Sequence, residues 1–121
     1  MPFDWIKFWN VGEHLRVFSK KEEYQRSAVG RYYYACFLLC RDYYENVLDE
    51  ELDKSEAHQN LIDFFKDSDN HIENEISRHL KILRFIRNKA DYSREFYFYN
   101  VRRSRKKSKI IFSLLKKLNK G

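Results

Sequence analysis

Apolar residues recur along most of the chain at steps of three and four, which places them on one face of a helix. This spacing predicts five helical segments joined by short polar stretches, and no alternating pattern of a strand accompanies it. The longest segment is apolar on most sides, so we expect it at the centre of the fold. The predicted helices span residues 4–18, 19–47, 55–67, 71 to between 89 and 92, and 99–118.

Polar residues at the predicted helix starts favour these boundaries. Asp4 and Ser55 stand where N-caps are expected, and Ser19 with Glu22 three residues later matches a capping box. The acidic stretch 49–53 is expected to be a linker. The chain has only 3 Gly and 1 Pro, so little interrupts its helices. We therefore predict an all-α fold, an up-and-down bundle of four to five helices.

The composition fits one domain over residues 1–121. It is 43% hydrophobic and 17% aromatic, which is too apolar for a disordered segment and sufficient for one core. Cys36 and Cys40 stand four apart in an apolar run, and we expect them to be buried free thiols. No apolar run approaches the roughly 18 residues of a membrane span, and no secretory signal is visible. We expect a cytoplasmic protein without a membrane segment.

Charge is distributed unevenly along the chain, whose formal net charge is +6. Residues 1–60 carry 8 Lys and Arg against 11 Asp and Glu, whereas residues 61–121 carry 16 against 7. Such asymmetry indicates a polyanionic partner such as a nucleic acid, although a merely solvated helix face has the same pattern. The basic residues predicted to bind nucleic acid lie on the last helix and are Arg102, Arg103, Arg105, Lys106, Lys107 and Lys109.

A polar cluster lies beside the apolar stripe of the fourth predicted helix. Arg84, Arg87, Asn88 and Asp91 stand at positions i, i+3, i+4 and i+7 and therefore share one face. Two guanidiniums beside an amide form a fork that matches a phosphate. The alternative is a surface network in which Asp91 pairs with an arginine and ends the helix. No His or Cys spacing fits a metal site, and we expect neither a metal nor a cofactor.

Two segments carry a more specific pattern. Residues 26–37 are RSAVGRYYYACF, and residues 83–92 are LRFIRNKADY. The first resembles the second-helix signature of prokaryotic HEPN domains, and the second resembles their late-helix signature, in the same order and at a similar separation. The helical plan is similar over about residues 4–118.

The resemblance implies a fold, a partner and an activity. HEPN domains are α-helical bundles that usually form homodimers, with the late-helix motifs of two chains facing each other in one cleft. Many are metal-independent endoribonucleases of toxin–antitoxin, phage-defence and CRISPR-linked systems. A frequent partner is a small nucleotidyltransferase that acts as the antitoxin. The resemblance therefore implies a homodimer that cleaves RNA, such as tRNA or mRNA.

The resemblance also implies roles for individual residues. Arg87 would steady the scissile phosphate and Asn88 would orient the backbone or the nucleotide. The family's histidine is absent, and Tyr92 stands in its place. A tyrosine with a pKa of about 10 is a poorer base than a histidine, although a partner nucleotidyltransferase could modify Tyr92. The other residues implied for the cleft are Arg84, Asp91, Arg31 and Tyr34.

Two alternatives to a ribonuclease remain. One is a catalytically inactive HEPN module that binds nucleic acid, a nucleotide or a nucleotidyltransferase. The other is a structural helical protein whose basic last helix binds the ribosome, DNA or a membrane surface. Ser104 and Ser108 lie in the apolar stripe of that helix, which favours packing against the bundle over insertion into lipid.

Overall fold

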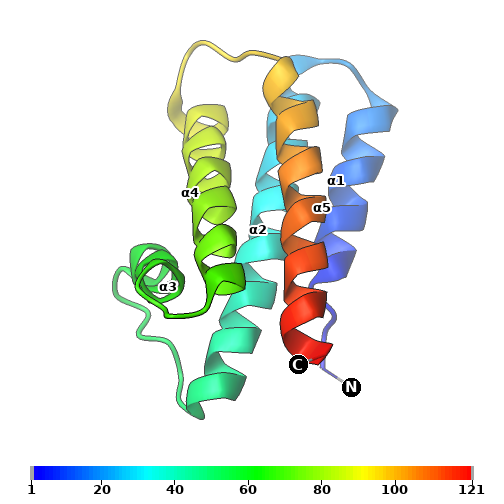
Figure 1. The fold of residues 1–121 in the computed structure, drawn as a ribbon. Helices are drawn as coiled ribbons and strands as arrows, with labels where there is room; N and C mark the ends of the chain where they lie inside the picture. The colour runs from blue at the N-terminus through cyan, green and yellow to red at the C-terminus, as the bar shows by residue number, and fades with distance from the viewer. Residues whose placement is uncertain (1, 121) are drawn as a thin grey trace.

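The computed structural model describes residues 2–120, and within this range it contains five α-helices and no strand (Figure 1). The predicted all-α class is therefore confirmed. None of the helices over these residues has the length and apolar character that crossing a bilayer requires. The helices are α1 (Ile6–Phe18), α2 (Glu22–Leu48), α3 (Ala57–Lys66), α4 (His71–Tyr92) and α5 (Tyr99–Lys120).

Four long helices lie side by side, and the short α3 crosses them beside α4 (Figure 1). α2 packs against all four other helices, as its broad apolar surface predicts. The two ends of the described chain lie at the same end of the bundle, and the α1–α2 and α4–α5 connections lie at the opposite end. The arrangement brings α2, α3 and α4 together around one half of the core.

The core is built around aromatic residues of α2. Tyr32 and Tyr33 are fully buried, and each belongs to a different apolar cluster along the bundle. Cys36 and Cys40 are buried free thiols, as predicted. Ser108 faces the bundle because its Oγ accepts a hydrogen bond of 2.7 Å from Nε1 of Trp9 in α1. The serines in the stripe of α5 therefore serve packing within the bundle.

The predicted helix boundaries are confirmed for α4 and approximately for the other helices, but all three predicted caps are wrong. Asp4 lies one residue before the N-cap of α1, which is Trp5. Asn70 caps α4, since its Oδ1 accepts from the backbone N–H groups of the next turn. Ser19 does not cap α2, because α2 begins at Glu22 and its N-cap is Lys21, whose backbone N–H donates to Oγ of Ser19 at 3.1 Å. In this connection between α1 and α2, the side-chain amide of Gln25 donates to the backbone carbonyl of Ser19 at 2.7 Å. Ser55 also fails as a cap, since α3 begins two residues later.

Candidate anion-binding site

Helices α2 and α4 bring four of the predicted site residues into direct contact around one guanidinium. Nη2 of Arg87 donates to the hydroxyl of Tyr34 at 2.8 Å, and Nη1 donates to Oδ1 of Asn88 at 3.2 Å. Nε of Arg87 lies 2.9 Å from Oδ2 of Asp91, one turn along the same helix. The same spacing that predicts a shared helix face thus produces a cluster anchored on α2. We call Arg87, Tyr34, Asn88 and Asp91 the Arg87 cluster.

The side chain of Arg87 is largely buried, with 16% of its surface exposed. Its Cζ lies 5.1 Å from the ring centroid of Tyr34 and 5.8 Å from that of Tyr33, so aromatic faces support the cation. The Nε–H is not aligned with Asp91 despite the short distance, which makes this contact an ion pair without a good hydrogen bond. A guanidinium has five N–H donors. One N–H on each terminal nitrogen therefore has no partner among residues 2–120 and can bind an anion.

Two further arginines border this cluster. Arg31 lies with its Cζ 5.9 Å from the ring centroid of Tyr34. Arg84 donates from Nη1 to Oε1 of Gln59 in α3 at 3.0 Å, so it reaches across to a different helix. The cluster and its border hold three guanidiniums and one carboxylate. An anion therefore meets a positive local field.

His58 of α3 also lies at this site, although no spacing in the sequence predicts it. Its Nδ1 lies 2.6 Å from the hydroxyl of Tyr33, and its ring stacks on Phe37 at a centroid distance of 4.0 Å. Burial, and then the positive charges of Arg84 and Arg87, lower the pKa of His58 to about 4. The imidazole is therefore neutral at physiological pH. The packing of α3 brings His58 to this site. No motif in the sequence of α4 predicts that packing.

Arg26 of α2 holds the end of α4 in place. Its Nη1 donates to the carbonyl oxygens of Ala90 and Ser93 at 2.8 and 2.7 Å. Its Nη2 donates to the carbonyl oxygen of Arg94 at 2.9 Å. The last carbonyls of a helix lack partners within the helix and favour a nearby cation. Arg26 is thus a positioning residue for the turn that carries the Arg87 cluster, a role that the sequence alone did not assign.

Tyr92 is the predicted site residue that is not brought into the cluster. Its side chain is 78% exposed, and it makes no hydrogen bond with Arg87 or Asn88. Position i+5 turns it well away from Arg87 on a helix with 3.6 residues per turn. Tyr92 is instead accessible from solvent at the end of α4.

The basic residues of α5 separate into two groups. Arg102, Arg105, Lys106 and Lys109 line one groove together with Arg16 of α1. Arg103 and Lys107 point elsewhere, since Arg103 lines a cavity beside the end of α4 and Nζ of Lys107 lies 3.4 Å from Nδ1 of His79. The predicted nucleic-acid-binding set therefore does not form one continuous surface.

The groove contains an internal ion pair that orders part of it. Nε of Arg105 donates to Oε1 of Glu13 at 2.7 Å, and Arg16 also contacts this carboxylate. Burial raises the pKa of Glu13, but the hydrogen bonds from Arg105, Tyr32 and Arg16 outweigh it and hold the pKa at about 2. Among the residues that the structure describes, the groove cations without an ion-pair partner are therefore Arg102, Lys106 and Lys109.

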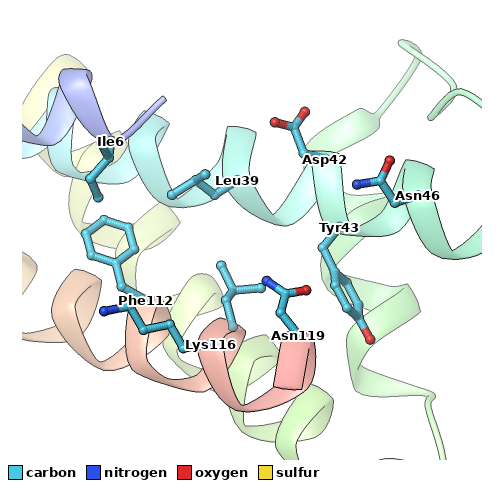
Figure 2. Close-up of a pocket in the computed structure, with 9 residues that line it drawn as sticks. Ile6, Leu39, Asp42, Tyr43, Asn46, Phe112, Lys116 and Asn119 are labelled. Atoms are coloured by element: carbon cyan, nitrogen blue, oxygen red, sulfur yellow. The ribbon is translucent and has the colours of Figure 1, made fainter. Parts of the chain in front are cut away.

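A separate cavity of about 280 Å³ lies between α1, α2 and α5 (Figure 2). Ile6, Leu39 and Phe112 gather at one end of it, and the rest is lined by Asp42, Tyr43, Asn46, Leu115, Lys116 and Asn119. None of its lining residues belongs to the Arg87 cluster, so this cavity is not part of the candidate site. Across residues 2–120, no three His, Cys, Asp or Glu side chains converge in a way that would hold a metal ion.

No protein-family model matches the chain, and no curated protein and no solved structure is similar enough to count as a match. The resemblance of residues 26–37 and 83–92 to HEPN signatures therefore stays a prediction from the sequence. The geometry of the Arg87 cluster stands independently of it.

Proposed function

We propose that the protein is a HEPN-type endoribonuclease that cleaves RNA without a metal ion and acts as a homodimer. The observation that carries this proposal is the Arg87 guanidinium, which is largely buried, held on three sides and still has N–H groups to offer. A cation that is fixed before the ligand arrives stabilises charge on a phosphate without further reorganisation.

The neighbours of Arg87 support phosphate binding in different ways. Tyr34 and Asn88 fix the plane of the guanidinium, and Asp91 holds it from the Nε side. Arg84 and Arg31 add positive charge at the border. In a homodimer, two such helix ends would meet, and their mutual repulsion favours a bound anion between them.

His58 supplies the proton acceptor that the missing motif histidine would otherwise provide. In the proposed reaction Nδ1 of a neutral His58 donates to the hydroxyl of Tyr33, which leaves Nε2 free to take the proton of the ribose 2′-hydroxyl. The 2′-oxygen attacks the adjacent phosphorus, the bond from phosphorus to the 5′-oxygen breaks, and that oxygen takes a proton from water. The products are a 2′,3′-cyclic phosphate and a 5′-hydroxyl. Arg87 and Arg84 stabilise the additional negative charge on the phosphate oxygens.

The test is cleavage of tRNA and of an unstructured RNA in EDTA by the purified protein and by two variants. Arg87→Ala is expected to lower the rate by about a hundredfold or more, because a preorganised charge donor contributes that much. Arg87→Lys keeps the charge but loses the fork, and it is expected to recover only part of the rate. Arg78→Ala, an exposed arginine of the same helix, is the matched control. Cleavage by Arg87→Ala at the wild-type rate would remove the proposal.

A catalytically inactive module remains the second candidate, and the exposed side chain of Tyr92 favours it. A tyrosine that is 78% exposed at the end of α4 is accessible to a nucleotidyltransferase partner, as a docking or modification site in a toxin–antitoxin pair would require. Under this hypothesis the protein binds RNA in a salt-sensitive manner and leaves it intact. Binding without cleavage in the same EDTA assay distinguishes the two candidates.

A further inference from the structure

The connection between α4 and α5, yellow in Figure 1, ends in three consecutive exposed aromatic residues. Tyr97 is 55% exposed, Phe98 54% and Tyr99 56%, and we call these three residues the aromatic connection. Tyr97 and Tyr99 line a cavity of about 200 Å³ beside α4. Phe98 lines another cavity, of about 320 Å³, beside the end of α1. The aromatic connection therefore presents rings on both of its sides.

Contacts within the fold hold these rings in place. The hydroxyl of Tyr97 donates to Oε2 of Glu95 at 3.1 Å, and its ring centroid lies 5.9 Å from that of Tyr99. The ring of Phe98 packs edge-on against Phe96 at a centroid distance of 5.6 Å. Large aromatic side chains that gather on a surface mark an interaction site. Because the rings are already positioned, a ligand that stacks on them loses little affinity to their ordering.

Positive charge surrounds the aromatic connection on both sides. Lys89 and Arg103 line the cavity beside α4. Lys20 and Arg102 line the cavity beside α1. Among the described residues that line these two cavities, Glu95 is the one carboxylate. This surface would repel a second copy of itself, whereas a phosphate backbone is complementary to it.

The cavity beside α1 continues into the basic groove between α1 and α5. Arg16 and Arg102 line both of them. The groove adds Lys106 and Lys109, which follow Arg102 by about 6 and 10.5 Å along the axis of α5. The aromatic connection thus lies between the groove and the cations beside α4. None of the residues that line these three hollows belongs to the Arg87 cluster.

We propose that the aromatic connection and the groove together bind single-stranded RNA without a preference for particular bases. Unpaired bases stack on Tyr97, Phe98 and Tyr99, which is independent of sequence because every base has a ring face. The cations of the groove contact the phosphates of the same strand. A duplex keeps its bases paired and stacked inside the helix, so it reaches the groove but not the aromatic rings. The inference rests on the proposed function only in taking the ligand to be RNA.

The test is equilibrium binding of a mixed-sequence RNA of about 12 nucleotides, alone and annealed to its complement, measured by fluorescence anisotropy. All proteins carry Arg87→Ala, so that cleavage does not enter the measurement. The single strand is expected to bind about tenfold more tightly than the duplex, since stacking of one base contributes about that factor. Cleavage by the wild-type protein is measured separately. A failure of the proposed reaction and a failure of this site therefore give different results.

Aromatic and basic variants are expected to act differently on the two forms of RNA. Tyr99→Ala and Phe98→Leu should each weaken binding of the single strand about tenfold and leave binding of the duplex unchanged. Tyr99→Phe keeps the ring and most of the affinity, and leucine at position 98 keeps an apolar contact with Phe96. Replacing both Lys106 and Lys109 by glutamine should weaken binding of both forms.

The matched control removes an exposed aromatic ring elsewhere. Phe3 is 49% exposed and precedes α1, at the end of the bundle away from the aromatic connection (Figure 1). Phe3→Ala is expected to change neither affinity. Equal affinities for single strand and duplex, or an equal loss of both in Tyr99→Ala, would overturn the proposal. A changed oligomeric state of Tyr99→Ala would also overturn it, since the rings would then lie in a subunit interface.

Discussion

At the scale of single residues, the Arg87 cluster contains two kinds of contact. Helical spacing predicts the contacts within α4, whereas the contacts with other helices depend on packing. The contacts of Arg87 with Asn88 and Asp91 lie within one helix, so their positions in the sequence are sufficient to predict them. The contact with Tyr34 crosses to α2, and only the resemblance of the two motifs indicated it. No pattern in the sequence predicts that His58 of α3 lies at this site, because its position depends on how a third helix packs.

The neutral state of His58 gives a prediction about pH. A proton acceptor must be deprotonated, so kcat/KM is expected to rise as pH increases through the free protein's pKa of about 4. The profile should then stay level between about pH 6 and pH 8. An unperturbed histidine would instead give a rise centred near its ordinary pKa of 6.5. Circular dichroism at each pH identifies the range in which the protein is folded.

Variants of two histidines make this prediction specific. His58→Gln is expected to lower cleavage by about a hundredfold, the contribution typical of a positioned general base. His79→Gln, which alters a histidine that lies beside Lys107 rather than at the Arg87 cluster, is expected to leave the rate unchanged. Full activity of His58→Gln with an unaltered pH profile would assign proton transfer to another group.

At the scale of elements, apolar periodicity located all five helices, and local capping chemistry was the weaker guide. Asn70 caps α4 as a polar residue before an apolar stripe should. Ser19 and Ser55 have equally suitable side chains but do not cap, because the helices begin later, after the N-caps Lys21 and Glu56. The side-chain amides of Gln25 and Asn60 bind the backbone carbonyls of these serines across the turns. Cap signals alone therefore place a helix start only to within a few residues.

Two helical glycines test the packing of α1 on α2. A Cβ at Gly12 would lie 2.9 Å from Cε1 of the buried Tyr32, whereas a Cβ at Gly30 would meet nothing within 4 Å. Gly30→Ala is expected to raise the free energy of unfolding by about 0.5 to 1 kcal/mol through helix propensity. Gly12→Ala is expected to lower it by about 1 kcal/mol, because overpacking outweighs the same gain.

Urea denaturation of both variants measures the difference directly. Gly30→Ala serves as the control for the general benefit of alanine in a helix. An equal gain in stability from both substitutions would mean that α1 does not approach α2 as closely as the distances at Gly12 indicate.

At the scale of the whole molecule, the excess of positive charge in the second half of the chain is divided between separate surfaces. One group of cations lines the groove between α1 and α5, and another lies beside the end of α4. Composition predicts the amount of charge and the helix that carries it. It does not predict the division, which follows from how α5 is rotated against its neighbours.

The groove between α1 and α5 predicts how RNA affinity depends on salt concentration. Each phosphate contact to single-stranded nucleic acid contributes a slope of about −0.7 to the dependence of log K on log salt concentration. The three free cations Arg102, Lys106 and Lys109 should therefore contribute about −2. Replacing both Lys106 and Lys109 by glutamine is expected to make the slope shallower by about 1.4. The measurement is RNA affinity over a series of salt concentrations.

The control removes the same number of charges from the same helix. Lys116 and Lys117 lie two turns further along α5, outside the groove. Their replacement by glutamine should leave most of the slope intact. An equal effect of both double variants would mean that RNA responds to the overall charge of α5 and does not occupy the groove.

The most direct test of the account is the chemistry of the RNA ends produced by the purified wild-type protein in EDTA. A phosphate held by Arg87, with proton removal from the 2′-hydroxyl by His58, predicts 2′,3′-cyclic phosphates and 5′-hydroxyls, identified by mass spectrometry of the fragments. The Arg87→Ala protein should yield the same ends at a rate lower by about a hundredfold or more. Fragments with 3′-hydroxyl and 5′-phosphate ends, or intact RNA after prolonged incubation with the wild-type protein, would contradict the account.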